Sequence, residues 1–233
     1  RRLESLDAYV RAVTGEIREP VEVIEGGLRF PADLMSGQKT GWYFDQRASR
    51  AFVAPLAAGG AMLDVYCYTG AFALASAAAG ADAVLGVDSS REALTLARRA
   101  ADWNGVGAGI EFERGDAFRK LAELAGEKRR FRVVAADPPS FVRSRGELKS
   151  GLRGYRKLAH LASHLVENGG FLFIASCSHN VPGDAFASEV ALGITRAGRA
   201  ARIIRAAGAG PDHPVHPFLA ETAYLKSLVL QID

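Results

Sequence analysis

One stretch decides the fold of this chain: Ala61-Met62-Leu63-Asp64-Val65-Tyr66-Cys67-Tyr68-Thr69-Gly70-Ala71-Phe72. Residues 61–66 are a short, mostly apolar run that predicts a buried strand, and the turn ending at Gly70 allows a helix to begin. In an open parallel sheet a ligand binds at this kind of junction, where a strand gives way to a helix. We therefore expect a ligand to contact Tyr66, Tyr68, Thr69, Gly70 and Phe72.

Short apolar runs alternate with helical segments from about residue 60 onward, which indicates βαβ units and a mainly parallel sheet. Helices rich in Ala and Leu are predicted between the strands, for example over residues 91–103 and 154–167. The last strand follows a loop with three prolines, which favours a seven-stranded, doubly wound, Rossmann-like α/β sheet over the six-stranded order of dehydrogenases. The predicted strands are 61–66, 83–88, 110–113, 131–136, 171–176, 201–206 and 224–232.

The first fifty residues have a different pattern. Val21 to Ile24 and Leu28 to Phe30 flank Glu25-Gly26-Gly27, which predicts a hairpin. Before it, apolar residues at steps of three and four predict one face of a helix that ends near Pro20: Leu3, Leu6, Val10, Val13 and Ile17. We interpret residues 1–50 as a small helix and hairpin left from an upstream domain, and residues 51–233 as the main domain.

The composition is that of a globular protein. The 233 residues are 48% hydrophobic and 24% charged, and no apolar run approaches the roughly 18 residues of a membrane span. Two cysteines cannot form a disulfide framework and no secretory signal is evident, so a reducing cytoplasm is expected. The net charge of +3 permits a nucleic-acid partner without requiring one.

Acidic residues stand at the ends of three consecutive predicted strands. Asp64 can pair with a cationic amino group, Asp88 can accept hydrogen bonds from ribose hydroxyls, and Asp116 can accept one from an adenine amino group. Each could instead cap a helix. Only Gly70 could remain of a G-x-G-x-x-G fingerprint, which argues against a nicotinamide cofactor. The pattern favours an adenosine cofactor, contacted also by the following residues Ser89 and Ala117.

Two motifs follow the next strands and suggest where a reaction takes place. Asp137-Pro138-Pro139-Ser140-Phe141 must leave the sheet, because two prolines remove two backbone donors. It would form a rigid platform for a planar base, with Phe141 stacking on the base. Ser176-Cys177-Ser178 ends the fifth strand beside the expected cofactor. Cys177 would need a nearby positive charge or a helix N-terminus to become a thiolate, and the alternative is a buried, inert thiol.

Basic residues are concentrated after the Asp-Pro-Pro motif, between residues 143 and 157. They alternate with three glycines in what we predict is a flexible loop, and contact with RNA phosphates is favoured over a merely solvated face. The substrate contacts predicted from this cluster are Arg143, Arg145, Arg153 and Tyr155. His160 and His164 are one helical turn apart but lack a third ligand, so no metal site is predicted.

Five stretches resemble, in order, the bacterial large-subunit ribosomal RNA cytosine-5 methyltransferase family: Ser36 to Arg47, Asp64 to Phe72, Asp137 to Phe141, Ser176 to Ser178, and Asp212 to Val215. The likeness extends from about residue 20 to the C-terminus, and its first and fourth stretches are the most discriminating. It implies the class I methyltransferase fold, S-adenosylmethionine as cofactor, and ribosomal RNA as partner. A homodimer is left open.

The resemblance also implies residue roles. The Gln38 to Arg47 segment would close over the cofactor through Gln38, Thr40, Phe44 and Arg47. Asp137 would hydrogen-bond the cytosine edge, and Cys177 would be the nucleophile that adds to carbon 6, so that carbon 5 can accept the methyl group.

The chain departs from the family at Ala71, where members usually have Gly, and at Ser49, where they usually have Asn. Many RNA cytosine-5 enzymes have a second cysteine in the Asp-Pro-Pro region, where this chain has Ser140, so the acceptor of the carbon 5 proton is unassigned. The N-terminal RNA-binding domain usual in the family is absent here. Two other functions stay open: a guanine-nitrogen methyltransferase on ribosomal RNA, which would need no cysteine, and a non-catalytic RNA-binding module.

Overall fold

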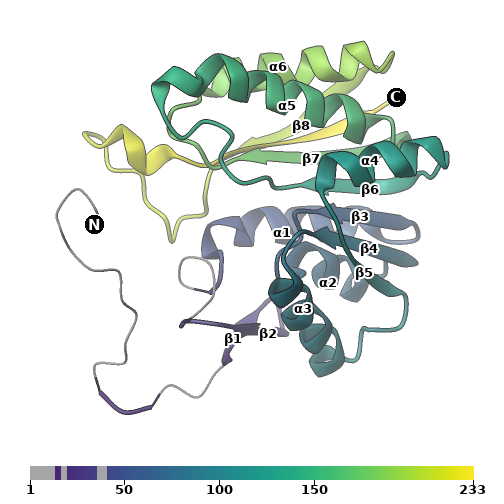
Figure 1. Ribbon diagram of the computed structural model, residues 1–233, viewed down its shortest axis with the longest axis vertical. Helices are drawn as coiled ribbons and strands as arrows, with labels where there is room; N and C mark the ends of the chain where they lie inside the picture. Colours follow the sequence, from purple (N-terminus) through teal and green to yellow (C-terminus); the bar gives the residue numbers. More distant parts are fainter. Residues whose placement is uncertain (1–13, 17–19, 36–40) are drawn as a thin grey trace.

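A seven-stranded sheet in the order β5-β4-β3-β6-β7-β9-β8 forms the centre of the computed structural model, which describes residues 14–16, 20–35 and 41–233 (Figure 1). All seven predicted strands are confirmed, with small shifts at their ends. The largest shift is at the start of β7, which begins five residues earlier than predicted. The strands are β3 (Ala61–Val65), β4 (Ala83–Asp88), β5 (Ile110–Arg114), β6 (Phe131–Ala136), β7 (Val166–Ser176), β8 (Ala201–Ala207) and β9 (Lys226–Ile232).

The strand order creates a switch point between β3 and β6. From β3 the chain builds outward through β4 to β5, and then it returns to β6 on the other side of β3 and continues to β7. All these strands are parallel, so their carboxyl ends share one edge. β9 lies antiparallel between β7 and β8. Ligands of doubly wound sheets bind outside the carboxyl ends at such a switch point.

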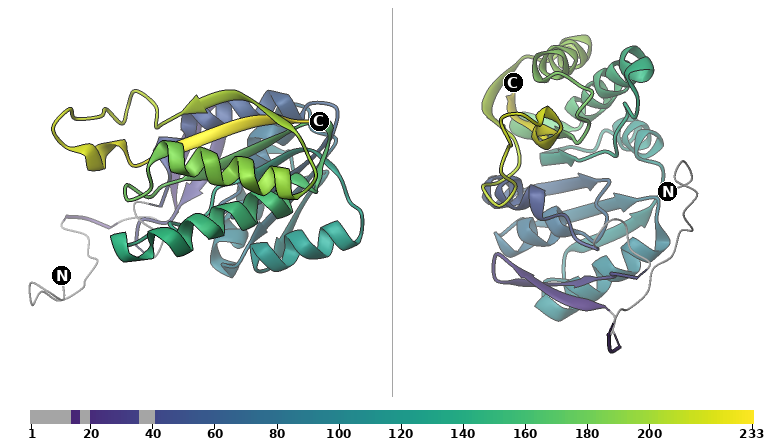
Figure 2. Two further views of the ribbon diagram at one scale, coloured as in Figure 1. Left: turned by 90° about the horizontal axis from the view of Figure 1, so that it is seen from above. Right: turned by 90° about the vertical axis from the view of Figure 1, so that its left-hand side faces the viewer.

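Helices cover both faces of the sheet (Figure 2). Alternate residues of each strand point to opposite faces, so Leu63 and Val65 pack toward α4, α5 and α6, whereas Met62 packs toward α1, α2 and the hairpin. None of the helices in the described residues is long and apolar enough to cross a membrane. The helices are α1 (Arg47–Val53), α2 (Ala71–Ala78), α3 (Arg91–Asn104), α4 (Ala117–Gly126), α5 (Leu148–Ser163) and α6 (Gly183–Arg196).

The predicted hairpin is confirmed as β1 (Val21–Glu25) and β2 (Leu28–Ala32), paired antiparallel. It is attached to α3, because the Arg29 amide donates to Asn104 Oδ1 (2.8 Å) and Asn104 Nδ2 donates back to the Arg29 carbonyl (2.7 Å). The predicted boundary after residue 50 falls inside α1, where Arg50 is buried. The predicted helix before Pro20 lies almost wholly outside the described residues.

The predicted flexible loop over the basic cluster is wrong. A short 3-10 helix, η4 (Arg145–Glu147), leads directly into α5, which begins at Leu148. Ser144 and Glu147 form a capping box, which is a sequence signal for the start of a helix. The glycines of this region hid that signal. Gly151 is required by packing, because a Cβ there would collide with Val142 and with the carbonyl of Phe141. The basic side chains of this region therefore stand on a helix.

Candidate active site

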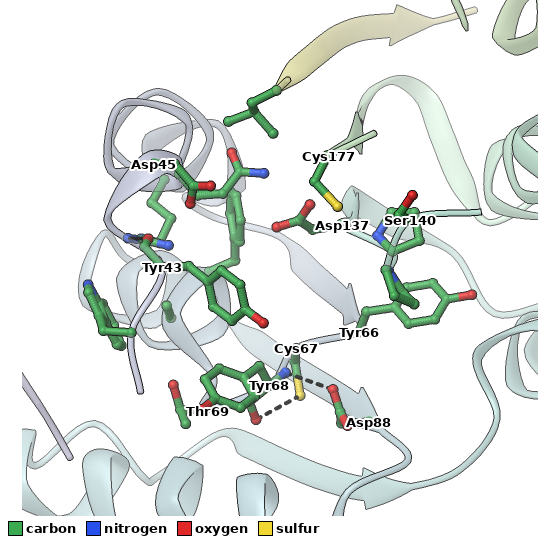
Figure 3. A pocket seen from close by; sticks show the side chains of 18 of the residues that line it. Tyr43, Asp45, Tyr66, Cys67, Tyr68, Thr69, Asp88, Asp137, Ser140 and Cys177 are labelled. Atoms are coloured by element: carbon green, nitrogen blue, oxygen red, sulfur yellow. Dashed lines mark hydrogen bonds between the residues drawn. The ribbon is translucent and has the colours of Figure 1, made fainter. Parts of the chain in front are cut away.

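A cavity of about 480 Å³ opens at the switch point, on the edge where β3, β4, β6 and β7 end (Figure 3). Six parts of the chain form its wall. The lining residues are Trp42, Tyr43, Asp45, Gln46 and Arg50, then Tyr66, Cys67, Tyr68, Thr69, Ala71 and Phe72, then Asp88 and Ser89, then Asp137, Pro138, Pro139 and Ser140, and finally Cys177 and Leu225.

The turn after β3 has an unusual backbone. Tyr66, Tyr68 and Gly70 all have positive φ angles, of 63°, 50° and 78°. Such angles are costly for tyrosine, and strain of this kind is concentrated at functional sites. At Gly70 a Cβ would lie 2.9 Å from Leu74 Cδ1 and 3.0 Å from Phe112 Cζ, so only glycine fits. The turn thereby presents Tyr66, Tyr68 and Thr69 to the cavity.

Asp88 fastens this turn from the neighbouring strand. Its Oδ2 accepts from the Tyr68 amide (2.9 Å), drawn as a dashed line in Figure 3, and its Oδ1 accepts from the Ser90 amide (2.8 Å). Both Asp88 and Ser89 line the cavity as predicted. Asp88 is therefore both an anchor of the β3 turn and a carboxylate within reach of a ligand.

The other two acids that were predicted to contact the cofactor accept hydrogen bonds from backbone amides at helix starts and do not line the cavity. Asp64 is 1% exposed and accepts from the Ala73 amide (3.0 Å), which secures the first turn of α2. Its burial raises the pKa of its carboxyl well above the usual range. Asp116 is exposed and caps α4 by accepting from the Arg119 amide (2.9 Å), so the helix-cap alternative describes it. Ala117, the next residue, is buried in the core.

The segment before α1 forms one wall of the cavity, and the residues of it that face inward are not the ones that were predicted. Asp45 and Gln46 face inward from the 3-10 helix η2 (Phe44–Gln46), with 5% and 2% exposure, whereas Phe44 is exposed. Arg47 also lies outside the cavity and contacts Glu25 and Asp212. The predicted contacts Gln38 and Thr40 lie outside the described residues.

Glu25 of the hairpin holds this wall in place. Its carboxylate accepts from Arg50 Nε (2.6 Å), Arg50 Nη2 (2.9 Å) and Trp42 Nε1 (3.1 Å). Arg50 also donates to the Tyr43 carbonyl (2.8 Å), and its guanidinium lies over the Trp42 ring. The hairpin therefore supports the site although it contributes no side chain to the cavity.

Several polar atoms of the wall are buried without a hydrogen-bond partner among the described residues. Both amide atoms of Gln46, Oδ1 of Asp45 and Oγ1 of Thr69 are in this state. The other carboxylate oxygen of Asp45 accepts from the Tyr224 hydroxyl (2.7 Å). Because a buried polar group without a partner costs free energy, these atoms indicate a polar ligand.

Cys177 and Asp137 stand at the end of the cavity away from Asp88, where Figure 3 shows the sulfur beside the carboxylate. The loops that carry them are linked, since the hydroxyls of Ser140 (2.9 Å) and Ser178 (2.6 Å) both donate to the Val142 carbonyl. Cys177 is partly exposed to the cavity. The structure therefore brings together the two residues that the sequence predicts to carry the reaction.

Tyr43 lies between the two ends of the cavity. Burial, together with the nearby Tyr68, Asp137, Cys177 and Asp45, raises the pKa of its hydroxyl to about 12. Its ring meets that of Tyr68 edge to face at 5.3 Å. Tyr43 was not among the predicted contacts, and its only sequence signal is its place in the stretch that carries the resemblance.

The prediction that Tyr155 touches RNA is wrong. Its side chain is fully buried, and its hydroxyl accepts from Ser176 Oγ (2.8 Å) beneath the Cys177 loop. The Phe141 ring packs on Tyr155 (4.8 Å) and toward Phe118 (6.0 Å), and Phe141 does not line the cavity. Both rings therefore support the reaction loops from below.

Comparison with known proteins agrees with this geometry. A family model described as S-adenosylmethionine-dependent methyltransferase matches residues 3–230. The chain belongs to this methyltransferase family. The cofactor of the family is S-adenosylmethionine, as the sequence predicts.

The methyltransferase also resembles individual proteins. It is 36% identical over 233 residues to ribosomal RNA large subunit methyltransferase I of Pseudoalteromonas atlantica, and 36% identical over 234 residues to the protein of that name in Aeromonas hydrophila. These alignments cover 100% and 99% of this chain and 59% of each relative. The chain thus spans about three fifths of the curated relatives it matches.

Solved structures confirm the methyltransferase fold. A methyltransferase structure from Streptococcus mutans superposes with a TM-score of 0.84 at 23% identity, covering 94% of this chain and 57% of that one. A tRNA m1G37 methyltransferase of M. jannaschii gives 0.68 at 15% identity, covering 97% and 60%. At these identities the likeness concerns the fold alone.

The second cysteine of the methyltransferase has a different environment from Cys177. Cys67 is buried in the β3 turn, its sulfur lies 3.9 Å from the Tyr68 carbonyl oxygen, and burial raises the pKa of its thiol well above the usual range. Of the two cysteines, Cys177 is therefore the one that is accessible from the cavity.

Basic side chains lie outside the methyltransferase cavity, on η4, on α5 and in the loop just before η4. Arg143, Arg145 and Arg153 are exposed, and no ion pair is recorded for them in the part of the chain that the structure describes. Arg156 differs, because it forms a two-point ion pair with Glu189 (2.5 and 2.8 Å). The exposed arginines present positive charge at the surface, and their contact with RNA phosphates stays a prediction.

Proposed function

We propose that this methyltransferase forms 5-methylcytosine in large-subunit ribosomal RNA through a covalent adduct at Cys177. One observation carries the proposal: a partly exposed thiol and a carboxylate, Cys177 and Asp137, share one end of a cavity whose other end is lined by Asp88, and whose wall has buried polar atoms without a partner among the described residues. Such a site offers a place for a methyl donor and a place for a base, side by side.

The chemistry of cytosine explains why a thiolate is needed. Carbon 5 is a poor nucleophile, but addition of the Cys177 sulfur to carbon 6 turns the ring into an enamine that can attack an electrophilic methyl group. S-Adenosylmethionine supplies that methyl group when bound. Loss of the carbon 5 proton to a base and expulsion of the Cys177 sulfur then restore the aromatic ring.

We assign the two ends of the cavity accordingly. Asp88 would accept from the ribose hydroxyls of the cofactor, and the unsatisfied amide of Gln46 would pair with its polar groups. Asp137 would hold the polar edge of the cytosine, and Pro138 and Pro139 would keep that loop rigid, because proline fixes the backbone. Ser140 would act indirectly, through its bond to Val142.

Two observations support ribosomal RNA as the substrate. Two relatives that are 36% identical to this chain are named ribosomal RNA large subunit methyltransferase I. In this chain, exposed Arg143, Arg145 and Arg153 follow the Asp-Pro-Pro loop and could contact phosphates while the base enters the cavity.

A guanine-nitrogen methyltransferase is the main competitor, because the same fold occurs in a tRNA m1G37 methyltransferase. That reaction needs an acceptor platform such as Asp137-Pro138-Pro139 but no nucleophilic thiol. The two hypotheses therefore make opposite demands on Cys177.

The test incubates the protein with methyl-labelled S-adenosylmethionine and unmodified large-subunit ribosomal RNA, followed by mass spectrometry of the nucleosides. We expect labelled 5-methylcytosine, and we expect Cys177→Ala to lower its rate by about two orders of magnitude or more. RNA containing 5-fluorocytosine should trap a covalent complex with the natural protein and with Cys67→Ala, but not with Cys177→Ala.

Calorimetry with S-adenosylmethionine completes the design. Cys177→Ala should bind the cofactor as the natural protein does, which would show that the lost activity is a lost chemical step. Labelled guanine, or full activity of Cys177→Ala, would overturn the cytosine-5 proposal. Failure of the natural protein to bind the cofactor would instead favour a non-catalytic RNA-binding module.

A further inference from the structure

Lys226 places its ammonium group inside the turn that carries Cys177. It is the first residue of β9 and pairs in register with Ser176, the last residue of β7. Its Nζ donates to the carbonyls of Ser178 (2.5 Å) and Val181 (2.7 Å), which lie one and four positions after Cys177. Two short bonds from one ammonium to one turn fix a positive charge there.

Several groups around Cys177 lie close enough to act on its charge. They include the hydroxyls of Tyr43, Tyr155 and Tyr224 and the ammonium of Lys226. Asp137, on the loop after β6, adds a negative charge on the cavity side.

Two other basic groups near this end of the cavity do not replace Lys226. Arg50 also lines the cavity, but Glu25 occupies its guanidinium. His179 follows in the same loop as Cys177 and is exposed.

Lys226 is suited to act on the thiol. It is only partly exposed, and in the described part of the chain no carboxylate forms an ion pair with it, so its charge is not cancelled locally. Burial lowers the pKa of the Lys226 ammonium, and the negative charge of Cys177 raises it. Because an electrostatic interaction acts equally on both partners, Lys226 must in turn favour the charged form of the sulfur.

We propose that Lys226 is a positioning residue that holds Cys177 as a thiolate and fixes the loop that carries it. This inference rests on the proposed role of Cys177 as nucleophile. Removing the ammonium would take away the positive charge inside the Cys177 turn, while the carboxylate of Asp137 would still face the thiol. Thiolate formation would then require a higher pH, because a like charge opposes it.

The test measures alkylation of Cys177 by iodoacetamide as a function of pH, with peptide mass spectrometry to separate Cys177 from the buried Cys67. Lys226→Gln removes the charge but keeps a donor for the two carbonyls. We expect its half-maximal rate to move upward by about one pH unit or more, with about tenfold slower alkylation near neutral pH. Lys226→Arg keeps the charge and should stay close to the natural profile.

Lys120→Met is the matched control, because Lys120 of α4 pairs with Glu113 of β5 and does not line the cavity. It should leave the profile unchanged. If Lys226→Gln binds S-adenosylmethionine and its profile coincides with that of the natural protein, the inference is wrong. Should Lys226→Gln not fold, Lys226→Met and Lys226→Arg decide the question, and an upward shift in both would reduce the role of Lys226 to loop structure.

Alkylation requires no RNA, so the result is independent of the target base. A shifted profile together with full methylation by Cys177→Ala would leave the electrostatic role of Lys226 standing and remove the proposed function. An unshifted profile with loss of methylation in Cys177→Ala would do the reverse.

Discussion

Glu25 offers the sharpest test of how the site is held together, because it supports the cavity wall without lining the cavity. Three donors from Arg50 and Trp42 converge on its carboxylate at 2.6–3.1 Å. The Glu25 and Arg50 side chains are only 9% and 5% exposed. Glu25→Gln keeps the shape of the side chain but removes its charge and turns one acceptor oxygen into a donor that faces Arg50.

The expected cost follows from this burial. Removing one partner of a buried ion pair leaves the other charge without compensation, which costs about 3–5 kcal/mol. We expect the lower end of this range, because the Tyr43 carbonyl still accepts from Arg50. For a domain of this size, about 3 kcal/mol corresponds to a fall in Tm of about 6–12 °C. The affinity for S-adenosylmethionine should fall as well, because Trp42, Tyr43 and Gln46 belong to the same wall.

The assay is thermal and urea unfolding of the natural protein and Glu25→Gln, together with calorimetric titration of the cofactor. Glu22→Gln is the matched control, because it removes an exposed ion pair with Arg29 from the same hairpin and should change stability little. If the two variants unfold at the same temperature and bind the cofactor equally well, the view of Glu25 as the anchor of the wall is refuted.

Four further results are expected. Tyr155→Phe should cost about 1 kcal/mol by removing the bond from Ser176, while RNA binding measured by filter retention stays the same. Asp88→Asn should weaken cofactor binding about tenfold in calorimetry, because its carboxylate fixes two backbone amides. Gly151→Ala should destabilise by about 1–3 kcal/mol in urea unfolding, since the Cβ has no room. The pKa of Tyr43 is raised to about 12 in the folded state. A pH titration followed by absorbance at 295 nm should therefore show a late-titrating tyrosine in the natural protein that is missing in Tyr43→Phe. Because the unfolded tyrosine ionises near pH 10, this group stabilises the fold below pH 10 and loses that contribution between pH 10 and 12.

The strands could be predicted closely because each is a short apolar run between clear breakers. β4 and β6 coincide with the predicted residues, since their flanking residues end the run abruptly. α5 was predicted only in part: the helix expected over residues 154–167 covers its second half, but Gly146 and Gly151 suggested a loop where its first turns lie. What overrides them is tertiary contact: the Phe141 loop packs against Gly151 and Gly154 and leaves no space for a side chain.

The site was predictable where function depends on position along the sheet. Asp88, Asp137 and Cys177 stand at strand ends, and parallel topology brings strand ends to one edge whatever the details. The inward wall was not predictable at residue level, because a single 3-10 turn has no periodicity long enough to define its phase. Asp45 and Gln46 therefore looked like surface residues, although both are buried.

The distribution of support around the cavity explains how one fold can serve different bases. The end near Asp88 is fixed by backbone bonds to the β3 turn, whose geometry follows from the sheet itself. The end near Cys177 depends on loops joined only by side chains, through the Val142 carbonyl and Lys226. Because those loops can change without disturbing the sheet, the cofactor half can be kept while the base half varies. Similarity of fold therefore predicts the methyl donor well and the methylated atom poorly, and the thiol is the feature that separates the two hypotheses.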